Sequence, residues 1–220
     1  GTTSMCVGGS TTLSSTPGGG TWSSIYPNVS ISASSGTATV TGTSTGTAVI
    51  TYTAGGNFVT KVVTVNGSPS SFGGPSSVCQ TEAVTLTNST TGGRWSSASS
   101  NVTVSGAGTT ASITGVSAGT AAITYSIGTC SATTTVSINP LAANTGTLIA
   151  FAPGGTTTLS NVNTGGTWSS GTPANASVGL TSGIVTGLTA GTTVNITYTL
   201  PTGCKSVSSV AVNAQPAAIG

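Results

Sequence analysis

The side chains that could do chemistry in this chain are few: four cysteines and four charged residues. The 220 residues contain no histidine and no aspartate, and Glu82 is the only side-chain carboxylate. General acid–base catalysis needs titratable groups placed beside one another, and a metal centre needs several His, Cys or carboxylate ligands close together. The composition therefore predicts no catalytic residue, no metal site, no cofactor and no enzyme. The chemistry that remains is disulfide formation.

The three basic residues are too few to form a nucleic-acid surface. Lys61, Arg94 and Lys205 lie far apart in the sequence, whereas binding to phosphates needs clustered cations that displace counterions. No apolar run reaches the roughly 18 residues needed to cross a bilayer, so no membrane span is predicted either. The numbering starts without an initiator Met or an apolar leader, which suggests a secreted chain whose signal has been removed.

The segments that must position these cysteines belong to a sequence repeat that occurs three times. Trp22, Trp95 and Trp168 follow one another at a single fixed interval, which we call the repeat period. The same interval recurs in two further sets, which are Leu13, Leu86 and Leu159, and Tyr52, Tyr125 and Tyr198. A period this long, with one large aromatic residue per copy, indicates an array of small domains rather than one core.

Each copy has the pattern of an all-β domain. In the second copy, short Val-, Ile- and Thr-rich stretches alternate apolar and polar residues and are divided by Gly and Ser, as in half-buried strands. About seven such strands per copy predict three tandem immunoglobulin-like β-sandwiches. The expected boundaries are 1–67 (lacking its first strand), 68–139 and 140–214, followed by a tail at 215–220. Trp22, Trp95 and Trp168 are expected to be core plugs, with carbohydrate stacking as the alternative.

The repeated segments resemble a known family. TATVTGTSTGTAVITYT (37–53) and TASITGVSAGTAAITYS (110–126) share a Val/Ile-x-Gly step followed by Gly-Thr-Ala-x-Ile-Thr-Tyr. This motif resembles bacterial immunoglobulin-like repeats of the group 2 type, and the low-charge Thr/Ser/Gly composition is similar to that of Bacteroidota surface proteins. The resemblance implies an extracellular or cell-surface protein that serves as a spacer, an adhesin stalk or a fibre subunit, without catalysis.

The cysteines are expected to cross-link in two ways. Cys79 precedes the second strand of copy two and Cys130 opens its last strand, so a disulfide within that domain is predicted. Cys6 and Cys204 have no partner in their own copies, because the matching positions are Asn57 and Ala152. Two alternatives remain for this pair: unpaired thiols, or a bond from Cys204 of one chain to Cys6 of the next.

The two ends of the chain match each other. If Gly220 were joined to a second Gly1, the interval from Val212 to the next Cys6 would equal the interval from Val65 to Cys79. Copy one is expected to lack its first strand, and the tail is a candidate donor strand for domain one of the next protomer. A longer covalent array is the alternative. The candidate donor residues are Gln215, Pro216, Ala217, Ala218, Ile219 and Gly220.

Three functions follow, from most to least favoured. The first is a structural subunit of a secreted extracellular filament that polymerises head to tail, with the chain itself as partner. The second is the stalk of a cell-surface adhesin. The third is a carbohydrate-binding module that meets surface glycans through aromatic residues such as Tyr26, Phe58 or Phe72.

Overall fold

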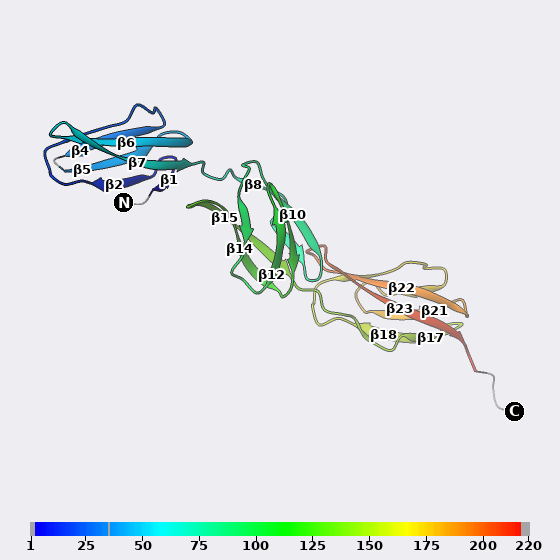
Figure 1. Cartoon of the computed structure of the whole chain (residues 1–220). Coiled ribbons are helices and arrows are strands. Elements are labelled where there is room, and N and C mark those ends of the chain that lie inside the picture. The colour runs from blue at the N-terminus through cyan, green and yellow to red at the C-terminus, as the bar shows by residue number, and fades with distance from the viewer. Residues whose placement is uncertain (1–2, 35, 217–220) are drawn as a thin grey trace. The chain divides into compact units, whose positions relative to one another are not determined.

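The computed structural model describes residues 3–34 and 36–216, and its regular elements are all β-strands, numbered β1 to β23. The strands form six sheets, two for each sequence repeat, and each pair makes one sandwich (Figure 1). The prediction of three tandem immunoglobulin-like sandwiches is confirmed. The described residues contain no helix long and apolar enough to cross a membrane.

The first sandwich has seven strands among its described residues. Its larger sheet has the order β1-β7-β6-β3, with β1 parallel to β7 so that Met5 lies opposite Val65, and its smaller sheet has the order β2-β5-β4. The bounds are β1 Ser4–Cys6, β2 Ser10–Ser14, β3 Thr21–Ser23, β4 Val29–Ser34, β5 Thr37–Gly42, β6 Gly46–Ala54 and β7 Asn57–Asn66.

The second sandwich has eight strands, because its first strand is split between the two sheets. The sheets have the orders β12-β13-β10-β8 and β11-β14-β15-β9. The bounds are β8 Phe72–Gly73, β9 Ser77–Cys79, β10 Ala83–Asn88, β11 Arg94–Ser96, β12 Val102–Ala107, β13 Thr110–Gly115, β14 Gly119–Ile127 and β15 Cys130–Asn139.

The third sandwich repeats this eight-stranded plan. Its sheets have the orders β16-β18-β21-β20 and β17-β23-β22-β19, and β17 runs parallel to β23. The bounds are β16 Thr145–Gly146, β17 Ile149–Ala152, β18 Thr156–Ser160, β19 Thr167–Ser170, β20 Ala176–Val178, β21 Ile184–Gly187, β22 Thr192–Thr199 and β23 Lys205–Ala214.

The cores follow directly from the period-two pattern. In β6, Ala48, Ile50 and Tyr52 are at most 3% exposed, and the residues between them face outward or are half-buried. In β14 the equivalent residues Ala121 and Ile123 are equally buried. The side chains on the outer face are chiefly Thr and Ser, which hydrate without charge and suit a pleated surface. Alternation alone thus places the core of each sandwich.

Each sandwich carries a Trp–Tyr pair with ring centroids 4.7–4.8 Å apart. The Tyr hydroxyl also closes the turn before the Trp strand: in the second sandwich, the Tyr125 hydroxyl donates to the Thr90 carbonyl and accepts from the Gly93 N–H. Tyr52 and Tyr198 make the same two contacts in their own sandwiches. These bonds fix the hairpin that positions the Trp.

One turn position has a left-handed backbone in all three sandwiches. It is Gly8 in the first (φ 82°) and Gly154 in the third (φ 83°), but Thr81 in the second (φ 67°). In every case its N–H donates to the carbonyl of a glycine that ends a neighbouring strand, respectively Gly42, Gly187 and Gly115. A β-branched residue is unfavourable in this conformation, so Thr81 stores local strain.

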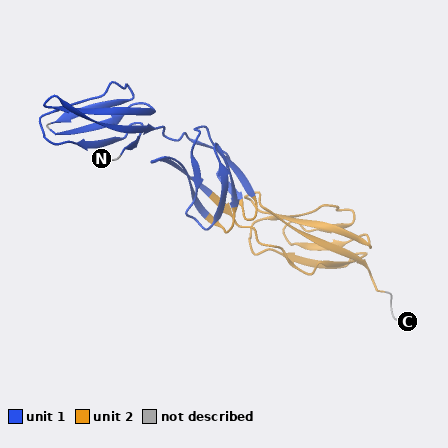
Figure 2. Cartoon of the chain, viewed as in Figure 1, with its two compact units in different colours: residues 1–78, 83–114, 120–136 blue, residues 79–82, 115–119, 137–220 orange. Residues whose placement is uncertain are grey.

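The contacts divide the chain into two compact units (Figure 2). The first comprises Gly1–Val78, Ala83–Thr114 and Thr120–Val136; it holds the first sandwich and most of the second. The second comprises Cys79–Glu82, Gly115–Gly119 and Ser137–Gly220; it holds the third sandwich together with one end of the second.

Candidate structural site: inter-repeat disulfides and an open sheet edge

The disulfides join different repeats, which corrects the predicted pairing. Cys6 is bonded to Cys130 and Cys79 to Cys204, with Cα–Cα distances of 5.6 and 5.7 Å. The prediction of a bond between Cys79 and Cys130 is wrong, and so are both alternatives for Cys6 and Cys204, because all four sulfurs are paired within one chain. Each bond lies within one compact unit.

The physical reason for the correction lies in where each cysteine sits along its sandwich. Cys6 and Cys79 end the short strand that lies beside the last strand of their sandwich, and that last strand leads into the next repeat. Cys130 and Cys204 follow the hairpin that joins the last two strands. The exit end of one sandwich and this hairpin of the following one therefore supply the two halves of each bridge.

The positions that lack a cysteine also agree with bonds between neighbouring repeats. Asn57 stands in the first sandwich where Cys130 stands in the second, and Ala152 stands in the third where Cys79 stands in the second. The second sandwich, which carries both kinds of cysteine, is bridged on both sides. Cys6 and Cys204, which have no partner in their own repeats, are thus each bonded to a cysteine of the neighbouring repeat.

Hydrogen bonds support the second bridge. The Gln80 N–H donates to the Asn139 carbonyl, and the Gln80 side-chain oxygen accepts from the Leu141 N–H at 3.0 Å. Leu141 and Cys79 also pack against the core of the third sandwich. Cys204 is 1% exposed and Cys130 is 2% exposed. Burial shields one sulfur of each bond from reductant, and Gln80 holds the start of the linker at Asn139 and Leu141.

The Trp residues differ between sandwiches. Trp95 and Trp168 are 9% and 5% exposed, whereas Trp22 is only half-buried. In the second sandwich the Phe72 ring of β8 packs edge-on against Trp95, with centroids 5.6 Å apart. One repeat period back from Phe72 and Gly73, the two equivalent positions fall before residue 1, and the described residues of the first sandwich hold no strand equivalent to β8.

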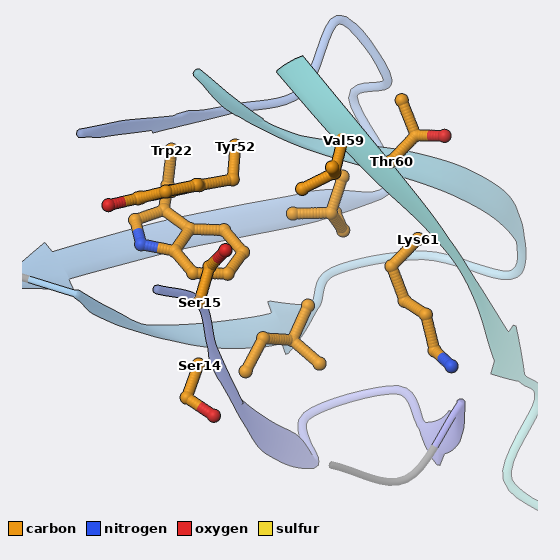
Figure 3. Close-up of a pocket in the computed structure, with 9 residues that line it drawn as sticks. Ser14, Ser15, Trp22, Tyr52, Val59, Thr60 and Lys61 are labelled. Carbon is orange, nitrogen blue, oxygen red and sulfur yellow. The ribbon is translucent and has the colours of Figure 1, made fainter. Parts of the chain in front are cut away.

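A slot lies beside Trp22 at the place that β8 occupies in the second sandwich, where the described residues of the first supply no strand. It is a pocket of about 200 Å³ (Figure 3). Ser14 and Ser15 line one side, and Val59, Thr60 and Lys61 of β7 line another. In the second sandwich the positions of Val59 and Lys61 are held by Ala132 and Thr134, which are half-buried. The first sandwich thus presents Val59, 60% exposed, at an uncovered entrance to its core.

An Asn whose structural role was not predicted from the sequence holds the covering strand in the second and third sandwiches. Asn88 is 2% exposed; its side-chain N–H donates to the Ser70 carbonyl at 2.8 Å, and its side-chain oxygen accepts from the Ser70 hydroxyl. Asn161 likewise donates to the Ala142 carbonyl at 2.7 Å. The recurrence of Asn at these two equivalent positions was a signal that could have revealed the contact. Ser15 stands in its place in the first sandwich.

The aromatic residues considered for carbohydrate binding do not form one platform. Phe72 is engaged with Trp95, while Tyr26 is 38% exposed and Phe58 is 70% exposed. Phe58 and Val59 both line a smaller cavity of about 110 Å³ with Ser15 and Pro17. Phe58 and Val59 therefore lie beside the slot, although both side chains are largely exposed.

No family model and no curated protein matches this sequence. Solved structures match its fold. A crystal structure of invasin, described as a bacterial integrin-binding protein, aligns with 96% of this chain at 18% identity and a TM-score of 0.50. A C-terminal fragment of intimin, in complex with the intimin-binding domain of the translocated intimin receptor, aligns with 66% of it at 16% identity and a TM-score of 0.47.

A titin fragment, I67–I69, aligns with 97% of this chain at 12% identity and a TM-score of 0.37. The chain spans 57% of the invasin structure's length and 64% of the intimin fragment's. At this level of identity the similarity to invasin shows the fold alone, which is a tandem immunoglobulin-like architecture.

Proposed function

We propose that this chain is an extension-limited structural segment of a bacterial surface stalk or filament, located outside the cell. One observation carries the proposal: each disulfide ties one repeat to the next, and the two bonds interleave along the sequence in the order Cys6, Cys79, Cys130, Cys204. The near absence of charged side chains and the bacterial immunoglobulin-like repeat motif agree with a structural role that needs no catalysis.

Interleaved bonds shorten the covalent path through the chain. When the chain is pulled from its two ends, the force passes through the first disulfide from Cys6 to Cys130. It then follows the backbone back to Cys79 and passes through the second disulfide to Cys204. This path contains only about 75 residues, or roughly 260 Å when fully extended, against roughly 750 Å for all 220 residues. Most of the first and third repeats lie outside it. Tension therefore cannot fully unravel them while the bonds remain.

Single-molecule stretching of the whole chain tests this proposal. The oxidised chain is expected to stop at roughly 260 Å, and the reduced chain at roughly 750 Å. Cys79→Ser with Cys204→Ser should stop at about 330 Å, and so should the matched pair Cys6→Ser with Cys130→Ser. Full extension of the oxidised wild-type chain would refute the proposal.

A filament that grows head to tail is the more specific form of this proposal, and one observation favours it over a simple stalk. The described part of the first sandwich lacks the covering strand that the second and third possess, and it exposes a slot there. In the filament another copy would complete it, and the junction would contain no disulfide because all four cysteines are already used. Negative-stain images of purified protein should show long uniform fibres for the filament and short particles for the stalk segment.

A further inference from the structure

We propose that the edge of β2 accepts an added strand, and that this strand is the tail (residues 215–220) of a second copy of this chain. Ile219 would fill the slot beside Trp22, and the backbone would pair with residues 14 and 15. The inference rests on the filament form of the proposed function and names its partner and contact.

The second sandwich shows the geometry that the added strand would adopt. In β8, Gly73 lies opposite Thr87 and Phe72 lies opposite Asn88, in antiparallel pairing. The Phe72 ring covers the Trp95 ring. One repeat period back, the positions of Thr87 and Asn88 are held by Ser14 and Ser15, which line the slot in the first sandwich.

The tail repeats the sequence of this strand. The segment SPSSFG (68–73) and the tail QPAAIG (215–220) share the proline, the apolar residue three positions later and the final glycine. Pro216 corresponds to Pro69, Ile219 to Phe72 and Gly220 to Gly73. Residues 217–220 lie outside the described part of the chain, so the correspondence is one of sequence.

The final glycine has a steric reason in the template. A Cβ added at Gly73 would lie 2.5 Å from the Thr87 hydroxyl oxygen, so a side chain there would force the Thr87 side chain to move. Phe72 is half-buried, whereas the preceding Ser71 is exposed. The donor therefore needs an apolar residue followed by glycine, and Ala218, which matches Ser71, would face solvent.

The acceptor is adapted to an apolar guest. Val59 is 60% exposed and Phe58 is 70% exposed, whereas the matching residues of the second sandwich are Ala132 and Ser131. Burying such side chains against an incoming Ile stabilises a complex, and pairing an exposed strand edge adds backbone hydrogen bonds. Both features occur in the sandwich whose described residues include no covering strand.

Sedimentation of the whole chain at increasing concentration tests the contact. The wild-type chain should associate, Ile219→Asp should associate roughly 100-fold more weakly or not at all, and Ala218→Asp, whose charge faces solvent, should behave as wild type. A synthetic NAQPAAIG peptide should inhibit wild-type association. A wild-type chain that stays monomeric throughout, or an Ile219→Asp chain that associates normally, would overturn the proposal.

A cysteine trap identifies the partner. Ser70 contacts Asn88 in the template, so Ser15→Cys combined with Ala217→Cys should give a ladder of multimers on non-reducing gels, and Ser15→Cys with Ala218→Cys should give far less. A cross-linked monomer, or equal ladders from both pairs, would overturn the assignment to a second copy. The stretching test is made on single chains, so failure of this contact and failure of the disulfide-limited extension are separate results.

Discussion

The first and second sandwiches have the same framework residues but differ at one edge. Both place a Trp beside a Tyr at about the same centroid distance, and both bury the same alternating strand residues. Of the two, as far as their described residues go, only the second has a strand such as β8 over its Trp and a fourth strand in that sheet. In the second sandwich this strand packs Phe72 against Trp95 and so helps to close the core.

The first sandwich also differs from the other two at the residue that binds the covering strand. Asn88 and Asn161 clamp the incoming strand by donating to its carbonyls, while Ser15 occupies that position in the first sandwich. A clamp is present where the strand belongs to the preceding linker of the same chain. Where no such strand is described, a shorter side chain leaves the edge open.

The largest expected effect comes from removing a bridge. Cys6→Ser with Cys130→Ser should lower the free energy of unfolding by about 5 kcal/mol on the chain-entropy model, because the bond spans 124 residues. Guanidinium unfolding would measure it. The matched variant Cys79→Ser with Cys204→Ser removes a bond spanning 125 residues and should cost a similar amount. No change from either pair would contradict a stabilising role.

Loss of the clamp should be the next largest effect. Asn88→Ala removes hydrogen bonds from a buried position and leaves the Ser70 carbonyl unsatisfied, so it should destabilise the second sandwich by about 2 kcal/mol. Ser15→Ala, at the matching position of the first sandwich, should change stability by less than about 0.5 kcal/mol. Thermal unfolding of both variants compares them directly, and equal losses would remove the distinction between the two edges.

The tyrosine bonds should differ by environment. Tyr125→Phe leaves the Gly93 N–H and the Thr90 carbonyl without their partner and should cost about 2 kcal/mol. Tyr52→Phe breaks the same two bonds at a tyrosine that lines the slot, where water can replace the hydroxyl, and should cost about 1 kcal/mol. The measurement is the midpoint of thermal unfolding. A larger loss for Tyr52→Phe would show that the slot excludes water.

The left-handed turn offers a test with a gain of stability. Thr81→Gly should stabilise the second sandwich by about 1 kcal/mol, because glycine adopts this conformation without strain. Gly8→Thr introduces the same strain into the first sandwich and should destabilise it by a similar amount. Calorimetry would detect the opposite shifts. A fall in stability for Thr81→Gly would mean that the Thr81 side chain stabilises the turn.

The smallest effect is expected from pH. Glu82 is the only side-chain carboxylate and there is no histidine, so few protons are exchanged on unfolding between about pH 3 and 9. The unfolding midpoint should move by less than about 3 °C across this range. Because both sandwiches are almost free of charged side chains, the result should hold for each. A larger shift confined to one of them would contradict this account.

Much of the fold could be predicted from local patterns. Alternation in segments such as Gly46–Ala54 places the buried face of each strand, since successive side chains in a strand point to opposite sides. The repeat period predicted three sandwiches, but the prediction that the first lacks its whole first strand is wrong for the half that the structure describes, because β1 lies beside β7 as β9 lies beside β15. The Asn88 clamp was not predicted, because a polar residue at a strand end has many roles and only its contacts distinguish them.

The sequence by itself determined the repeat, the strand pattern, the scarcity of charged groups and the positions of the four cysteines. Only the tertiary structure decided which cysteines pair. A disulfide requires Cα atoms about 4.4–6.8 Å apart, and that distance depends on which ends of successive sandwiches meet, not on the spacing of residues along one strand. Cys79 is closer to Cys130 in sequence than to Cys204, yet it is bonded to Cys204. The unmatched positions Asn57 and Ala152 acquire a meaning only once that pairing is known.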